Sequence, residues 1–204
     1  MVGNASRRPF EFIANHIVLD FINTVNARPS FTRDDLACAD DILEWASAAG
    51  ALDDAGALVD EGRPPRGAAA AEQFESAVDL RELLYRVFGP LAAGTEPQPA
   101  ALASVARRAA DATCRAEWQR HASGYEPAWR HDSIEALGDR LADAAVQLLR
   151  SSAVARISSC DGCGWLFLDT SRARARRWCS MSACGVRHKM RRYHQRQATP
   201  AGAS

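Results

Sequence analysis

The sequence predicts a mainly α-helical protein that ends in a small, separately built module. In residues 1–150, apolar residues recur at intervals of three and four, which is the spacing of a buried helix face. Near the C-terminus, four closely spaced cysteines appear. The charge divides at the same place: the net charge of zero is the sum of −8 over residues 1–150 and +8 over residues 151–204. A length of 204 residues suits one domain plus a small module, or two small domains.

The first fifty residues predict two helices. Apolar residues continue at helical spacing over residues 10–27, with Asn15 as a candidate N-cap and Pro29 just beyond the end. A second apolar face extends over residues 36–49, and Gly50 follows as its C-cap. Both helices are expected to turn their apolar faces toward the core of an N-terminal domain.

The middle of the chain predicts further helices separated by loops. A short helix is expected over residues 53–59, and the glycines and prolines of residues 62–67 indicate a surface linker. Residues 68–93 present a long apolar helix face, which Gly89-Pro90 would kink or end. After a loop, the alanine-rich residues 100–111 predict a shorter helix.

A change of pattern over residues 113–131 predicts a small β-hairpin. Tryptophans flank a segment that contains Gly124, which favours two short strands around a turn. Asp132-Ser133 follows as the cap of a helix that extends to about residue 152. No flexible linker separates this helix from the cysteine module, so we expect the two parts to be mechanically coupled.

The four cysteines near the C-terminus predict a structural zinc site. Two residues lie inside the first pair, four inside the second pair and fifteen between the pairs. Zinc takes four thiolates at tetrahedral positions, and each short pair can supply two neighbouring ligands. A disulfide pair, a redox-active CxxC motif and free thiols are the alternatives, but no secretory context supports disulfides. We expect one zinc ion, Zn²⁺, bound by Cys160, Cys163, Cys179 and Cys184. The remaining Cys38 and Cys114 are expected to be small buried apolar residues.

The module is expected to fold as a treble-clef-like zinc finger made of a knuckle, a β-hairpin and a helix. Residues 160–164 form the tight turn, residues 165–169 and 174–178 the two strands, and residues 184–195 the helix. A module this small is not stabilised by burial alone, so zinc should contribute to its folding free energy. On the helix, an apolar stripe should face the hairpin; it consists of Val186, Met190 and Tyr193.

The basic side chains of the module predict binding to a polyanion. Residues 151–204 contain ten Lys and Arg residues and two acidic residues. Three arginines alternate with alanines over residues 172–176, which would place them on one face of a strand. A solvated charged face is the alternative, but this excess of basic residues on a zinc module favours phosphate contacts. The candidate nucleic-acid-binding residues are Arg172, Arg174, Arg176, Arg177, Arg187, His188, Lys189, Arg191, Arg192 and Gln195.

Double-stranded DNA is the favoured polyanion. The exposed face of the predicted helix could enter a major groove while the hairpin arginines contact the backbone. RNA is less favoured, because the finger has no obvious exposed aromatic residue on which single-stranded bases could stack.

Several short blocks carry a family resemblance. Around the cysteines these are Trp165–Ser171, Arg177–Met181 and the run Cys184-Gly185-Val186-Arg187. They resemble the CGNR-type zinc finger of bacterial proteins proposed to regulate transcription, with Val186 in the position of the asparagine. Residues 20–24 and 41–46 are similar to the ABATE domain, which accompanies CGNR fingers and is proposed to belong to stress-induced transcription regulators. The resemblance implies three parts: a helical regulatory domain at 1–152, a zinc finger at 153–197 and a disordered tail at 198–204.

Four polar residues share one face of the first predicted helix and define a candidate effector pocket. They are Asp20, Asn23, Thr24 and, just beyond the helix, Arg28. A solvated or interhelical hydrogen-bonding face is one alternative. The other is that these residues fix the finger against the body of the protein.

The sequence therefore predicts a zinc-dependent, DNA-binding transcription regulator of bacterial type. The N-terminal domain would sense an unidentified effector or form a homodimer. The alternative is an interaction module whose basic finger docks onto a protein of the transcription machinery, or an RNA-binding module. No catalytic motif is visible, so we expect no enzyme activity. No signal-peptide pattern or long apolar run is found, which predicts a cytoplasmic protein that does not associate with membranes.

Overall fold

The structure, a computed structural model, describes residues 9–26, 28, 33–51, 67–122, 124–129 and 133–198. The predicted fold class is confirmed: the chain is mainly helical, with small antiparallel strand pairs and a cluster of four cysteines in its C-terminal part. The short helix expected at 53–59, most of the linker at 62–67 and the tail beyond residue 198 lie outside the described residues. None of the described helices is long and apolar enough to cross a membrane.

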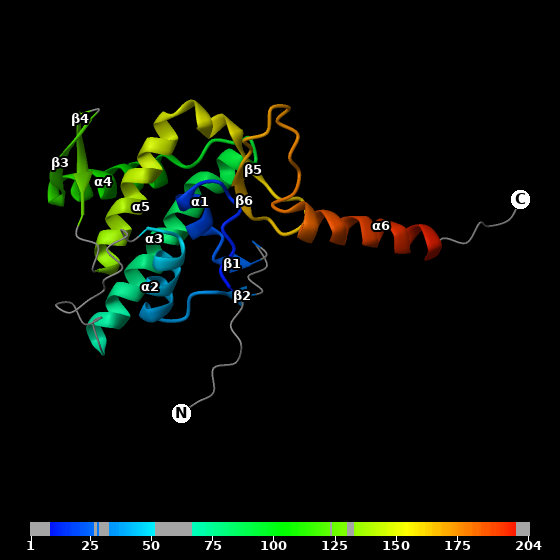
Figure 1. Cartoon of the computed structure of the whole chain (residues 1–204), viewed down its shortest axis with the longest axis horizontal. Coiled ribbons are helices and arrows are strands. Elements are labelled where there is room, and N and C mark those ends of the chain that lie inside the picture. Colours follow the sequence, from blue (N-terminus) through cyan, green and yellow to red (C-terminus); the bar gives the residue numbers. More distant parts are fainter. Residues whose placement is uncertain are drawn as a thin grey trace, which may run out of the picture.

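The helical body is built around one long helix, α3 (Ala68–Ala92). Around it pack α1 (Ile17–Ile22), α2 (Ala39–Ala48), α4 (Pro99–Arg115) and α5 (Ile134–Arg150), as Figure 1 shows. Their apolar faces meet in a core that includes the fully buried residues Phe21, Trp45, Leu80, Leu84 and Phe88. The predicted N-cap of α5 is confirmed, because the Ser133 side chain accepts a hydrogen bond from the N–H of Ala136 at 3.1 Å.

The first helix is much shorter than predicted. Instead of spanning residues 10–27, α1 covers six residues and has His16 as its N-cap. Asn15 is not the cap; it adopts a positive φ of 61°, which breaks the helix before it can begin. After α1, Val25–Asn26 forms strand β1, which pairs with β2 (Arg33–Asp34). The apolar spacing before residue 17 therefore reflects burial in an irregular segment, not a helix.

The remaining helices of the body match their predictions closely. Helix α2 covers Ala39–Ala48 within the expected residues 36–49. Helix α3 continues through Pro90 and ends two residues later. Helix α4 begins with Pro99 in its first turn, where a missing N–H costs nothing, and extends to Arg115, four residues past its predicted end.

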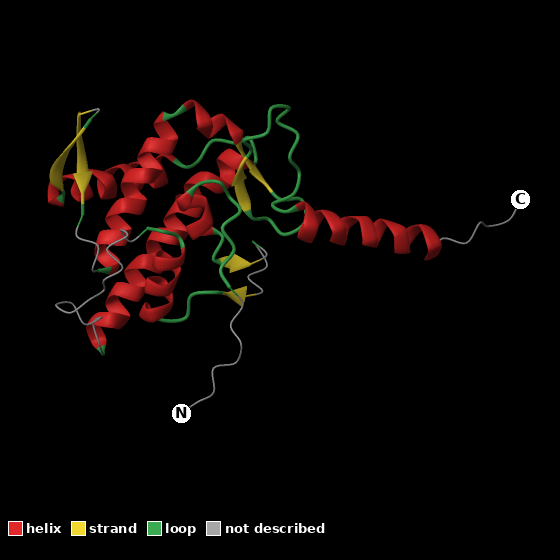
Figure 2. Cartoon of the chain, in the orientation of Figure 1, coloured by secondary structure: helices red, strands yellow, loops and turns green. Residues whose placement is uncertain are grey.

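The predicted β-hairpin between α4 and α5 is confirmed. Strands β3 (Glu117–His121) and β4 (Gly124–Ala128) pair in antiparallel register. Figure 2 shows this hairpin in yellow at the end of the molecule opposite the last helix. Its base is anchored by Trp129, whose indole N–H donates to the carbonyl oxygen of Ala112 at 2.8 Å.

The C-terminal module begins directly after α5. A short 3-10 turn (Ser152–Arg156) leads into strand β5 (Ile157–Ser159), which pairs antiparallel with β6 (Leu166–Leu168). A single π-helical turn (Met181–Gly185) precedes the last helix, α6 (Val186–Ala198). Helix α6 projects away from the body, as Figure 1 shows.

The hairpin of the module uses the first predicted strand but not the second, because β6 lies within residues 165–169 while residues 174–178 form no strand. The partner of β6 is β5, which precedes the first cysteine. The alternation of arginines over residues 172–176 therefore does not produce one basic strand face, and Arg174 adopts a positive φ of 48°. The physical reason is that the other edge of β6 is occupied by the N-terminal domain, as described below.

The two cysteines outside the cluster are not buried as predicted. Cys38 lies exposed at the start of α2, and Cys114 lies exposed near the end of α4. Both occupy helix positions that face solvent, so their apolar character is not used in the core.

Candidate metal centre

The four predicted zinc ligands meet at one point. The sulfur atoms of Cys160, Cys163, Cys179 and Cys184 all lie within 4.8 Å of one another. The Cys163 and Cys179 sulfurs are 3.5 Å apart, and those of Cys179 and Cys184 are 3.6 Å apart. A tetrahedral Zn–S₄ centre with bonds of about 2.3 Å has sulfur–sulfur distances of about 3.8 Å. The donor set and its size therefore fit one zinc ion, and four thiolates without an open position define a structural site.

The knuckle that carries the first two ligands depends on two glycines. The N–H of Gly162 points at the Cys160 sulfur, 3.4 Å away, and a Cβ on Gly162 would lie 3.2 Å from the Cβ of Cys184. Gly164 has a φ of +73°, and a Cβ there would lie 2.4 Å from the carbonyl oxygen of Arg28. Gly164 therefore serves two purposes: it closes the knuckle and lets the N-terminal domain approach it.

The thiols perturb one another strongly. Without a cation between them, the hydrogen bond with Cys160 raises the pKa of the Cys163 thiol to about 12. The neighbouring Cys160 and Cys163 thiols also raise the pKa of Cys179. Four adjacent thiolates repel one another, and a bound dication removes that repulsion. Ligand deprotonation and metal binding are thus coupled at this site.

The N-terminal domain completes the sheet edge of the finger. Backbone groups of Leu166 and Leu168 point away from β5, toward the body. The Asn23 side chain accepts from the N–H of Leu166 at 2.9 Å and donates to its carbonyl oxygen at 2.8 Å. The carbonyl of Ala14 accepts from the N–H of Leu168 at 2.8 Å, and Asn15 donates to the Leu168 carbonyl at 3.1 Å. All four outer-edge groups of β6 are paired, so no second strand of the finger can bind there.

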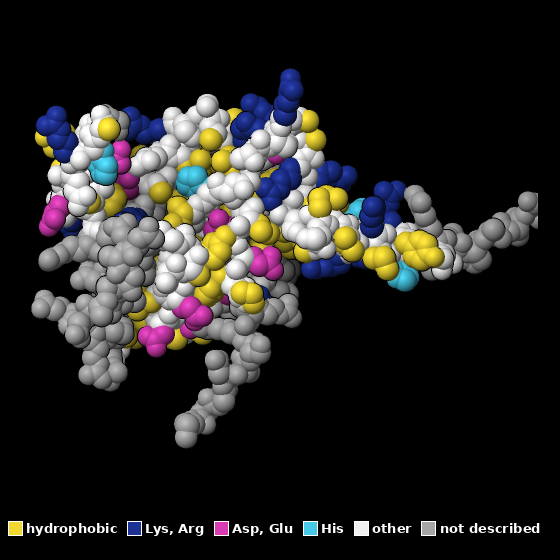
Figure 3. All heavy atoms as spheres, viewed as in Figure 1, with side chains coloured by type: hydrophobic (Ala, Val, Ile, Leu, Met, Phe, Trp, Pro, Cys, Tyr) yellow, Lys and Arg dark blue, Asp and Glu magenta, His cyan; other side chains and the backbone are white. Residues whose placement is uncertain are grey.

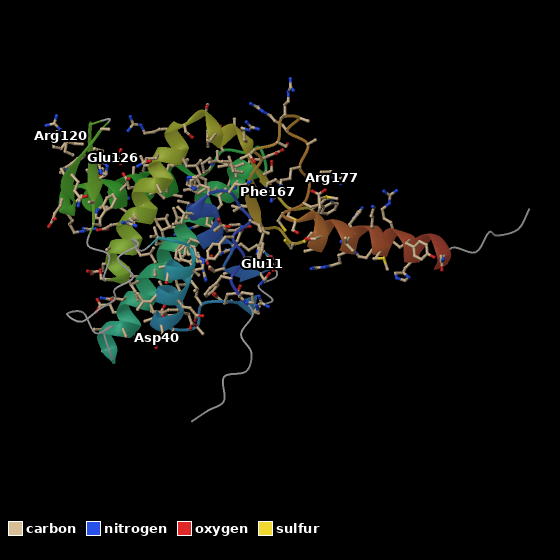
Figure 4. The ribbon with its side chains drawn as sticks, in the orientation of Figure 1. Glu11, Asp40, Arg120, Glu126, Phe167 and Arg177 are labelled. Atoms are coloured by element: carbon tan, nitrogen blue, oxygen red, sulfur yellow. The ribbon has the colours of Figure 1, made fainter. Side chains whose placement is uncertain are left out.

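The body also contacts the finger through aromatic and basic side chains. The Trp165 indole N–H donates to the Val25 carbonyl at 3.0 Å. Phe167, labelled in Figure 4, is fully buried, and the Arg176 guanidinium lies over its ring at 4.3 Å. Arg176 also donates to backbone carbonyls of Ile13, Trp178 and Cys179. These contacts join the segment around the third zinc ligand to the N-terminal domain.

Asp20 stabilises the backbone segment on the body's side of this junction. Its carboxylate accepts from the N–H groups of Ile13 at 3.0 Å and Ala14 at 2.9 Å. Those bonds hold the segment whose carbonyl oxygens bond to Leu168 and Arg176. Burial raises the pKa of Asp20 from its ordinary value of 3.8 to about 6, against the opposing effect of the two backbone bonds.

Thr24 and Arg28 belong to a second polar network beside the finger. Arg28 makes a bidentate ion pair with Glu82 on α3, with distances of 2.7 and 2.8 Å, and lies over the Tyr85 ring. The Thr24 hydroxyl accepts from Arg81, which also makes a bidentate pair with Asp34. Arg81 is 2% exposed, so its charge is neutralised inside the protein.

Asn23 bonds to the finger directly and Asp20 holds the segment that does so, which corresponds to the alternative in which these residues fix the finger against the body. The side chains of Thr24 and Arg28 bond within the body, to Arg81 and Glu82, which corresponds to the hydrogen-bonding alternative. The cavity lined by Asp20, Asn23 and Thr24 measures about 10 Å³, which is room for about one water molecule.

Sequence reasoning missed Arg81 and Glu82, because charged residues on a helix resemble a solvated face. It also missed Asp169, whose carboxylate accepts from the N–H groups of Ser171 and Arg176. An aspartate directly after a strand and before Thr-Ser is the signal of such a turn.

The candidate nucleic-acid-binding residues do not all face solvent. Figure 3 shows Lys and Arg side chains along α6 and over the adjoining loop. Arg176 is half-buried by the contacts described above. Arg177 pairs with Asp161 at 2.6 Å, but its side chain is 67% exposed. His188 is half-buried against the Trp178 ring, 4.7 Å between centroids, and does not point away as predicted. The exposed candidates are Arg172, Arg174, Arg177, Arg187, Lys189, Arg191, Arg192 and Gln195.

The apolar stripe of α6 is exposed, contrary to the prediction. Val186, Met190 and Tyr193 are between 50% and 55% exposed. The stripe was expected to face the hairpin, but the hairpin's aromatic residues Trp165 and Phe167 pack on the N-terminal domain and α6 projects into solvent. Because Tyr193 is exposed, the absence of stacking aromatics no longer argues against single-stranded nucleic acid.

Fold and site together define a zinc-binding protein in which a helical domain holds a four-cysteine finger. Residues 15–152 match the ABATE family, described as "Putative stress-induced transcription regulator", and residues 156–197 match the CGNR zinc finger. The chain therefore belongs to the ABATE family and carries a CGNR zinc finger. No curated protein matches the chain.

Proposed function

We propose that the protein is a zinc-dependent transcription regulator whose finger binds double-stranded DNA. One observation carries the proposal: α6 projects from the molecule and contains basic residues without a single acidic one. A solvated charged face usually mixes both signs, whereas an unpaired basic helix lowers its self-repulsion by binding a polyanion.

The dimensions of α6 support a duplex as the partner. An α-helix fits the major groove of B-DNA, which is about 12 Å wide. Arg187 and Arg191 lie one helical turn apart on α6, while Arg172 and Arg174 extend from the exposed loop before the third cysteine. Helix residues would contact base edges and loop residues would contact phosphates. Arg176 takes no part in this surface and instead positions the loop.

Zinc gives this surface its geometry. Cys179 and Cys184 bracket the turn that starts α6, so the metal fixes the direction in which the helix leaves the body. Removing zinc should therefore abolish DNA binding even if α6 stays helical. The regulatory part of the proposal rests on the ABATE family description.

The test is binding of the zinc-loaded full chain to a mixed duplex pool, with and without a zinc chelator. Replacing Arg174 and Arg191 by alanine together should weaken binding about 10-fold or more while zinc content stays at one per chain. The matched control is Arg107→Ala, which should have no effect; Arg107 is an exposed arginine on α4 whose side chain, among the described residues, bonds only to Ser104. Binding that survives chelation, or that is unchanged in the double variant, overturns the proposal.

The exposed apolar stripe favours one second candidate, docking of α6 onto a protein of the transcription machinery. Met190→Glu with Tyr193→Glu would abolish such docking. The duplex-pool experiment distinguishes the two candidates. A finger that binds DNA retains duplex from the pool, whereas a finger that only docks onto a protein does not. Including single-stranded DNA and RNA as competitors tests the RNA-binding alternative in the same assay.

A further inference from the structure

The β3–β4 hairpin stands apart from the rest of the molecule. All five residues of β3 and the first three of β4 are exposed, so neither face of the hairpin packs on the body. An isolated two-stranded hairpin is marginally stable in water. Exposed large side chains on it, Trp118 at 55% and Tyr125 at 64%, add to the apolar surface left in solvent.

The register sorts the hairpin side chains into two faces. Trp118 lies opposite Pro127, and Arg120 lies opposite Tyr125, so these four share one face. The other face carries Glu117, Gln119, His121 and Glu126. Figure 4 labels Arg120 and Glu126, which come from the two different strands.

The two outer edges of the hairpin differ. Pro127 has no N–H, so its pair with Trp118 must be one without ladder hydrogen bonds, and the backbone of Pro127 faces outward. A proline there blocks the β4 edge against another strand. By the same alternation, the N–H and carbonyl groups of Trp118 and Arg120 point outward from β3. Among the described residues outside the hairpin, no backbone group bonds to them.

We propose that the β3 edge pairs with the β3 edge of a second copy of this chain, forming a four-stranded antiparallel sheet across a two-fold axis. The axis passes by Gln119, so that Trp118 of each copy lies opposite Arg120 of the other. Both residues have outward backbone groups, so each such pair forms two hydrogen bonds and the dimer gains four. This register pairs all five residues of β3.

Two antiparallel copies of β3 place side chains of complementary chemistry opposite each other. In the proposed register, Trp118 meets an arginine, which gives a cation–π contact between the strands. Glu117 meets His121 of the other copy, which is an acid–base pair at a closely spaced position. Registers whose two-fold axis passes by Trp118 or by Arg120 do not form these two pairs. The register centred on Arg120 also places the two Arg120 side chains opposite each other. The charge pattern thus selects a second copy and one register.

The dimer would leave the zinc finger free. The hairpin and α6 lie at opposite ends of the molecule, as Figure 1 shows. Self-association through β3 therefore covers none of the surface proposed to bind DNA, and the two proposals can fail separately.

The experiment is sedimentation velocity on the zinc-loaded full chain from low micromolar to submillimolar concentration. Wild type should show a concentration-dependent monomer–dimer equilibrium. His121→Glu and Glu117→Arg should each weaken dimerisation about 10-fold, because each alters two symmetry-related pairs. The double variant restores opposite charges and should recover most of the affinity. Both side chains are exposed, so circular dichroism should show unchanged folding in all three variants.

A crosslink tests the register. In a Cys38→Ser, Cys114→Ser background, Gln119→Cys should form a disulfide-linked dimer on mild oxidation, because the two cysteines face each other across the axis. Glu126→Cys on β4 is the control and should crosslink far more slowly. A chain that is monomeric throughout, or a dimer indifferent to the charge changes, overturns the proposal. So would a dimer lost instead in Met190→Glu, which would place the interface on α6.

Discussion

At the scale of single residues, Asn23 acts as a substitute for a β-strand. Its side-chain amide makes the same two hydrogen bonds to Leu166 that a neighbouring peptide group would make. The Asn23 side chain is 3% exposed, so water cannot replace either bond. This residue therefore links the stability of the finger to that of the body.

The first prediction concerns this amide. Asn23→Asp keeps the shape but replaces the donor with a carboxylate facing the Leu166 carbonyl, so unfolding free energy should fall by about 3 kcal/mol. Urea unfolding of the zinc-loaded chain measures it. Asn15→Gly removes an exposed bond to the same strand while tolerating the positive φ at that position, and should cost about 1 kcal/mol or less. Equal losses in the two variants would contradict the role given to Asn23.

The second prediction concerns Gly164. Gly164→Ala requires a positive φ and drives its Cβ into the Arg28 carbonyl, so we expect a loss of at least about 3 kcal/mol. Gly50→Ala has a similar φ of +63° but open space around its Cβ, so it should cost only about 1 kcal/mol. Thermal unfolding compares the two. A similar loss of stability in Gly164→Ala and Gly50→Ala would mean that the close approach of Gly164 to Arg28 does not contribute to the stability of the fold.

The third prediction is a pH dependence from Asp20. Its folded pKa of about 6 lies above its ordinary value of 3.8, so the folded state binds the proton more tightly than the unfolded state. The stabilisation from this group is complete below about pH 4 and is lost as the pH rises through 6. Relative to Asp20→Asn, wild type should lose up to about 3 kcal/mol over that interval. A constant difference between the two proteins from pH 4 to 7 would refute this.

At the scale of elements, strand β6 shows what the sequence could and could not predict. The four ligands and the helix after them follow from cysteine spacing, because zinc chemistry fixes local geometry. The partner of β6 does not follow, because Ile157–Ser159 and residues 174–178 are both short and suitable for a strand. The choice depends on Asn23 and Ala14, which are more than 140 residues away and already occupy the other edge.

The length of helix α1 and the burial of the apolar stripe on α6 were mispredicted for related reasons. Apolar spacing over residues 10–27 reports burial, but Asp20 binds the N–H groups of Ile13 and Ala14 and so favours an irregular turn. The stripe on α6 has the same periodicity as a buried face. Its expected partners, Trp165 and Phe167, are already packed on the body, so the stripe remains in solvent.

At the scale of the whole molecule, finger and body share one hydrophobic core. The buried cluster that contains Phe21 and Leu84 also contains Trp165, Phe167 and three of the zinc-ligating cysteines, Cys160, Cys179 and Cys184. The fourth prediction follows: the zinc-loaded chain should unfold in a single calorimetric transition, and chelation should shift that whole transition to lower temperature. A separate finger transition, with the body unaffected by chelator, would show that the two parts are energetically independent.

The most direct test of the central claim, that the finger is a zinc-dependent DNA-binding surface, is the salt dependence of duplex binding by the full chain. Log affinity should fall linearly with log salt, with a slope of about −0.9 for each phosphate neutralised. In the Arg174→Ala, Arg191→Ala variant the slope should become shallower by about 2. Affinity that does not change with salt, or a slope that stays the same in the variant, would contradict the account.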